Sequence, residues 1–93
     1  MCRNIRVLHN FQPPTTPEEI RAASLQYVRK VSGIQKPSRT DDAAFEAAVH
    51  AVADATTKLL ASIAARGEPR TREGELAKAR AKWQARAARI ARA

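Results

Sequence analysis

The sequence predicts an all-α protein: an antiparallel helix hairpin with an extended N-terminal arm and a third, basic C-terminal helix. Residues 16–33 and 40–65 each carry apolar side chains at helical spacing, and only the short turn 34–39 separates them. So brief a connection requires the two helices to lie antiparallel. Residues 71–93 form a third helical stretch, because they are dominated by alanine, lysine and arginine.

The sequence contains capping signals at both ends of the first predicted helix. Thr16 is a good N-cap, Pro17 suits the first helical position, and Glu19 completes a capping box with Thr16. Gly33 suits the left-handed residue that ends a helix. At 100° per residue, the predicted buried stripe consists of Ile20, Ala23, Ser24, Tyr27 and Val31.

Residues 1–14 precede this helix and form the predicted arm. Pro13 and Pro14 favour an extended approach to the helix cap. The arm is too short for its apolar spacing to distinguish a helical turn from a strand. We expect it to lie across the helices through Ile5, Leu8 and Phe11.

The second predicted helix runs from about residue 40 to residue 65. Ser38 or Thr40 is its expected cap, and Gly67 with Pro69 is expected to end it. Its predicted stripe consists of Phe45, Ala48, Val49, Val52, Thr56, Leu59, Leu60 and Ile63. Residues 1–67 would then be the arm and hairpin core, and residues 68–93 a basic helix in the same domain or a semi-independent extension.

The third helix carries a narrow apolar seam. Leu76, Trp83 and Ile90 are spaced by seven residues, with Ala79 and Ala87 between them. This seam could pack on the hairpin or pair with a second copy of the chain, which would make the protein a homodimeric interaction module.

A core for only 93 residues must be thin, because a chain of this size buries a modest share of its surface. Aromatic residues are only 4% of the sequence. The large side chains expected to form the core are Ile5, Leu8, Phe11, Ile20, Tyr27, Phe45, Val49, Val52, Leu59, Leu60, Ile63, Leu76, Trp83 and Ile90.

The positive charge is concentrated in the C-terminal part of the chain. The formal net charge is +8, and residues 69–93 contain eight of the 17 basic residues but two of the nine acidic ones. This distribution favours an acidic partner, either nucleic acid or an acidic protein. The predicted nucleic-acid contacts are Lys78, Arg80, Lys82, Arg86, Arg89 and Arg92.

No catalytic motif occurs in the sequence, so we expect a non-enzymatic interaction protein without a cofactor. The alternative function is a thiol-dependent or metal-dependent site at Cys2, where removal of Met1 would leave an amine and a thiol on one residue. The other residues of this predicted site are Arg3, Asn4 and Arg6. A metal site would require His9 and His50 to converge on Cys2, and we predict none.

One cysteine cannot form an internal disulfide, and no segment has the length and hydropathy of a signal peptide or a membrane span. We therefore expect a cytoplasmic protein with no membrane association.

Five segments of the sequence form a specific pattern: MCRNIR at 1–6, NFQPP at 10–14, EEIRAASLQYVRKVSG at 18–33, KPSR at 36–39 and AFEAAV at 44–49. In these segments the chain resembles a bacterial family of small uncharacterised proteins, a domain of unknown function that opens with the MCRNI motif. The resemblance covers about residues 1–65 and fades after Gly67. The family has no established activity, so the resemblance implies no catalytic residue.

Overall fold

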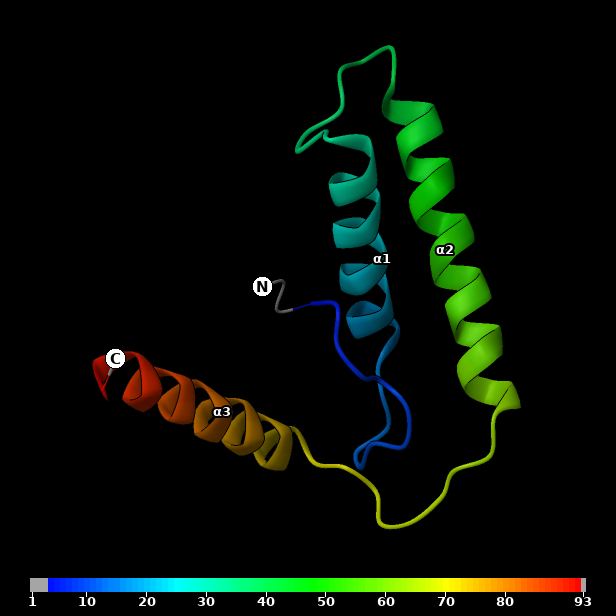
Figure 1. Ribbon diagram of the computed structural model, residues 1–93. Helices are drawn as coiled ribbons and strands as arrows, with labels where there is room; N and C mark the ends of the chain where they lie inside the picture. The colour runs from blue at the N-terminus through cyan, green and yellow to red at the C-terminus, as the bar shows by residue number, and fades with distance from the viewer. Residues whose placement is uncertain (1–3, 93) are drawn as a thin grey trace.

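The computed structural model describes residues 4–92, with the backbone alone for residue 92, and its regular structure is helical (Figure 1). Helix α1 spans Pro17–Ser32, α2 spans Asp42–Ser62 and α3 spans Arg72–Arg92. Helices α1 and α2 lie side by side and antiparallel, and they pack against each other. The predicted all-α class and the predicted hairpin are confirmed.

Helix α1 begins and ends as its sequence predicts. Thr16 is extended, with φ −87° and ψ 156°, and its hydroxyl accepts a hydrogen bond from the Glu19 amide. The Glu19 carboxylate in turn accepts from the Thr16 amide, which completes the capping box. Gly33 adopts the left-handed conformation, with φ 72°, and its amide donates to the carbonyl of Arg29.

The core of the hairpin lies between α1 and α2, where Val28, Phe45 and Val49 are buried. On α1 the buried positions are Ile20, Ser24 and Val28. The predicted stripe was therefore wrong at its C-terminal end, because Tyr27 and Val31 are 49% and 65% exposed. Helix α2 packs on the face of α1 that contains Val28, so Tyr27 and Val31 lie beside the interface between the two helices and not within it.

Helix α2 is shorter than predicted at both ends. Its N-cap is Asp41, which makes no side-chain capping bond, so the predicted cap at Ser38 or Thr40 was wrong. The Ser38 hydroxyl instead donates to the Asp41 carboxylate over 3.2 Å. The helix ends before Ile63, which is extended with φ −88° and ψ 141°. The carbonyl of Ile63 accepts a hydrogen bond from Nε2 of His9, so the chain contacts the arm directly after the helix ends.

Helix α3 extends away from the hairpin and packs against neither α1 nor α2 over the described residues (Figure 1). The Cα radius of gyration is 16.5 Å, compared with about 13 Å for a compact domain of 100 residues. The seam therefore does not dock on the hairpin of its own chain. The predicted core was too large, since it included side chains that are 43–69% exposed: Ile5, Tyr27, Leu59, Ile63, Leu76, Trp83 and Ile90.

Candidate functional site

The N-terminal arm is fastened to the segment that connects α2 and α3. Phe11 and Arg70 form an isolated parallel bridge. In this bridge the Arg70 amide donates to the Asn10 carbonyl over 2.7 Å, and the Gln12 amide donates to the Arg70 carbonyl over 2.9 Å. The Arg70 guanidinium also donates to the carbonyl of His9 over 2.7 Å. The arm and the connecting segment thus meet at the base of the hairpin.

Asn10 turns the arm at this junction. Its φ of 60° is in the left-handed region, which asparagine tolerates better than most residues with a side chain. Its Nδ2 atom donates to the carbonyls of Arg66 and Glu68, at 3.3 and 3.4 Å. Gly67, between these two residues, has a φ of 76°. The side-chain amide of Asn10 therefore holds a tight bend in the connecting segment.

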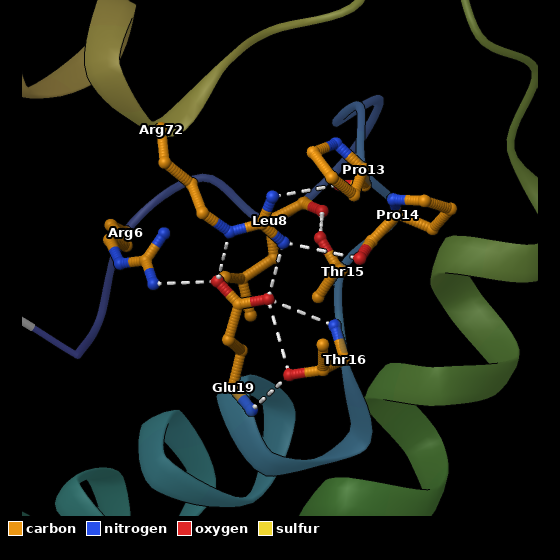
Figure 2. Close-up of polar contacts among 8 residues, drawn as sticks. All are labelled: Arg6, Leu8, Pro13, Pro14, Thr15, Thr16, Glu19 and Arg72. Atoms are coloured by element: carbon orange, nitrogen blue, oxygen red, sulfur yellow. Dashed lines mark hydrogen bonds and ion pairs between the residues drawn. The ribbon is translucent and has the colours of Figure 1, made fainter.

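The most highly bonded side chain in this region is the carboxylate of Glu19, in the first turn of α1 (Figure 2). Arg72 donates to both of its oxygens, from Nε to Oε2 over 3.0 Å and from Nη2 to Oε1 over 2.6 Å. Arg6 donates to Oε2 over 3.0 Å, and the Thr16 amide donates to Oε1 over 2.9 Å. We call Arg6, Thr16, Glu19 and Arg72 the Glu19 cluster.

The guanidinium of Arg72 connects this cluster to the arm (Figure 2). It donates to the carbonyl of Pro13 over 2.8 Å and to that of Pro14 over 3.1 Å. It also lies 5.4 Å from the centroid of the Phe11 ring, within cation–π range. Since Arg72 is the first residue of α3, these contacts fix the start of that helix against α1 and the arm.

The cluster lowers the pKa of Glu19 well below its usual range. The hydrogen bond from Arg72 is the largest cause, and the bond from the Thr16 backbone is the next. The hydrogen bond to Glu19 correspondingly raises the pKa of Arg72. A carboxylate that stays ionised and accepts four or more bonds is a poor general acid or base at neutral pH. The Glu19 cluster therefore has a structural role, in which it holds the arm and the start of α3 against α1.

Sequence reasoning found the capping role of Glu19 but missed its contact with Arg72. One signal was available, because Arg70 and Arg72 stand at the start of a predicted helix. Basic side chains are unfavourable at this positive end of the helix dipole unless they have anionic partners. The partners are Glu75, at 3.3 Å from Nε of Arg70, and Glu19.

The predicted nucleic-acid contacts all belong to α3. Their described side chains are exposed: Lys78, Arg80, Lys82, Arg86 and Arg89. Helical periodicity groups Lys78, Lys82 and Arg89 within about 40° of one another, with Arg86 at the edge of this group. Lys78 lies 3.9 Å from the Glu75 carboxylate. Within residues 4–92, the other four have no acidic group within ion-pair distance. The side chain of Arg92 lies outside the described part.

The structure describes only part of the predicted thiol site, because Cys2 and Arg3 lie outside the described residues. Asn4 and Arg6 are exposed. Arg6 donates to Glu19, which gives its guanidinium a carboxylate partner. The thiol site therefore stays a prediction.

Neither a metal site nor a membrane span is found among residues 4–92. No group of three or more histidine, cysteine, aspartate or glutamate side chains is arranged there to hold a metal ion. His50 is exposed, and the neighbouring Asp54 pairs with Lys58 over 3.0 Å. Within the same part of the chain, no helix has both the length and the apolar character needed to cross a membrane.

Residues 1–78 match the family described as Uncharacterized conserved protein (DUF2277). The chain belongs to this family. The DUF2277 match includes the arm, the hairpin and the whole Glu19 cluster, and it ends within the second turn of α3. Most of the apolar seam lies beyond it, and so does most of the basic face of α3, which consists of Lys78, Lys82, Arg86 and Arg89. No curated protein sequence and no solved structure matches the chain.

Proposed function

We propose that this member of the DUF2277 family is a small, non-enzymatic interaction protein that binds a polyanion, with nucleic acid the first candidate, through α3. The supporting observation is that α3 beyond its first turn stands apart from the hairpin, with the side chains of Lys78, Arg80, Lys82, Arg86 and Arg89 exposed. Cations that lack acidic partners can neutralise phosphates without first breaking internal ion pairs. Such contacts release counterions from the nucleic acid, which drives association.

The dimensions of the basic face suit a nucleic-acid backbone. The 12 residues from Lys78 to Arg89 span about 16 Å along the helix axis, at about 1.5 Å per residue step. This length corresponds to roughly five base pairs of B-DNA at 3.4 Å each. Lysine and arginine side chains on one face can therefore reach several phosphates of one duplex.

The expected recognition is independent of base sequence. Trp83 is the aromatic residue of α3, and it belongs to the apolar seam and not to the basic face. Contacts to phosphates position a protein but do not distinguish base pairs. Affinity should therefore depend steeply on salt and weakly on sequence.

The test is a titration of a short labelled DNA duplex with the full chain at two salt concentrations. In the triple variant Lys82→Gln, Arg86→Gln and Arg89→Gln, we expect weaker binding and a shallower salt dependence. The slope of log K against log salt should fall by about 0.9 for each phosphate that is no longer neutralised. The matched control is Lys30→Gln, Lys36→Gln and Arg39→Gln, which removes the same charge from exposed positions near the turn between α1 and α2.

An equal loss of affinity in both triple variants would contradict the proposal, because it would reflect net charge and not the face of α3. Absence of binding by the unmodified chain at low salt would also overturn it.

A further inference from the structure

The seam on α3 is exposed and has an internal symmetry. Leu76, Trp83 and Ile90 are 60%, 67% and 69% exposed. Leu76 and Ile90 lie seven residues on either side of Trp83, and Ala79 and Ala87 lie four residues on either side of it. The order large, small, large, small, large therefore reads the same in both directions. A helix face with this property is complementary to itself when two copies run antiparallel.

We propose that α3 pairs with α3 of a second copy, antiparallel, about a twofold axis beside Trp83. In this arrangement the two indole rings meet at the centre. Leu76 packs opposite Ile90 of the second copy, and Ala79 packs opposite Ala87 of the second copy. The Leu76–Ile90 and Ala79–Ala87 pairs each occur twice, on either side of the central tryptophan pair, so the interface is closed and uses the same surface of both chains.

The small residues make room for the large ones. The small alanine side chains on either side of the centre leave space there for a pair of tryptophan side chains. In proteins, most of the stability of a helix comes from packing of its apolar face, so burial of the seam also stabilises α3 itself. The hairpin does not supply this burial, since α3 packs against neither α1 nor α2 over the described residues.

The charges of α3 favour the antiparallel direction. Glu73 and Glu75 are in its first turn, whereas Arg86 and Arg89 are in its last two turns. At the first end the carboxylates of Glu73 and Glu75 offset the charges of Arg70 and Arg72, so this end is less basic than the last two turns. Antiparallel pairing places the less basic end of each helix beside the basic end of the other, whereas parallel pairing would place the two basic ends together, which costs free energy.

The pairing leaves most of the basic face open. Lys78, Lys82 and Arg89 lie about 100–140° around the helix from Trp83, whereas Arg86 lies about 60° from it, at the edge of the seam. Since antiparallel helices present equivalent sides to the same face of the pair, the basic residues of both copies would line one surface. The pairing depends on the seam and on the charge distribution of α3, and it stands whether or not a polyanion binds.

The expected dimer is weak. A standard specific interface buries about 800 Å² on each partner, through roughly 20–30 residues. The seam is much smaller than this, since each copy contributes only three large apolar side chains. The association should therefore depend on protein concentration.

The first test is sedimentation of the full chain without nucleic acid over a range of concentrations. We expect the average mass to rise toward twice that of the chain. The fluorescence of Trp83, the single tryptophan, should shift to shorter wavelength over the same range. The variant Leu76→Ala with Ile90→Ala should weaken association about tenfold or more. Val31→Ala with Leu59→Ala removes comparable exposed apolar side chains from the hairpin and should leave association unchanged.

The second test determines direction by disulfide cross-linking in a Cys2→Ser background. A mixture of Ala79→Cys and Ala87→Cys chains should form mixed disulfides faster than either chain forms disulfides with itself. Preferential cross-linking of each chain with itself would overturn the antiparallel arrangement. A chain that stays monomeric at every concentration would overturn the pairing as a whole, and loss of DNA binding alone would overturn only the proposed function.

Discussion

The base of the hairpin and the helix α3 are both rich in arginine, yet their charges are used in opposite ways. At the base, the guanidinium groups of Arg6 and Arg72 converge on one carboxylate, and Arg72 also satisfies two backbone carbonyls. Along α3, cationic side chains from Arg80 to Arg89 stay in solvent. The difference lies in the position of the carboxylates, because Glu19 stands where the arm, α1 and α3 meet. Arginine content alone therefore does not identify a binding surface.

The largest contrast between the two regions should appear when one aromatic side chain is removed from each. Phe45→Ala deletes a buried ring from the hairpin core and should lower the free energy of unfolding by about 3–5 kcal/mol. Trp83→Ala deletes a ring that is 67% exposed and should change it by less than about 0.5 kcal/mol in the monomer. Urea denaturation at low protein concentration measures both. Similar losses in the two variants would show that α3 packs on the hairpin in solution.

A smaller effect is expected from Glu19→Gln, which keeps the shape of the side chain but removes its charge. Hydrogen bonds to charged groups contribute about 1–3 kcal/mol, so the free energy of unfolding should fall by about that amount. The control is Glu46→Gln, whose ion pair with Arg21 has half-exposed side chains and should contribute less than about 1 kcal/mol. Thermal unfolding of both variants tests this. An equal loss in both would mean that the Glu19 cluster is no stronger than a surface pair.

The finest distinction is in the pH dependence of stability. Because the pKa of Glu19 is lower in the folded chain than in the unfolded chain, its contribution is fully present above about pH 5 and is lost as the pH falls. In that acidic range the unfolded state binds the extra proton, which reduces stability by up to about 1.4 kcal/mol per pH unit. The difference in stability between the unmodified chain and Glu19→Gln should shrink between pH 5 and pH 3. A constant difference would contradict the assigned cause.

Local features of the fold were predictable from the sequence because they depend on neighbouring residues. The cap of α1 at Thr16, its end at Gly33 and the short turn that makes the hairpin antiparallel all follow from a few adjacent positions. The buried stripe was predicted less well, since helical spacing gives a broad apolar face and the partner helix selects part of it. Val28 is buried and Tyr27 is half exposed for this reason.

The contacts of Arg72 could not be derived in the same way. They join residues 53 to 59 positions apart, and no local pattern relates the start of α3 to the first turn of α1. The exposure of the α3 seam is also a tertiary property. The spacing of Leu76, Trp83 and Ile90 predicts an apolar stripe, but the direction in which α3 leaves the base decides whether the hairpin can cover it.

The Arg72 contacts also set an order of events during folding. The hairpin closes a short loop, since Val28 and Phe45 are near in the chain, whereas the arm becomes fixed only when residues beyond position 70 return to it. Closing the longer loop costs more entropy and takes longer on average. During synthesis, the arm would therefore leave the ribosome before the hairpin but become fixed after it. An incomplete chain would carry a formed hairpin with a loose N-terminal arm.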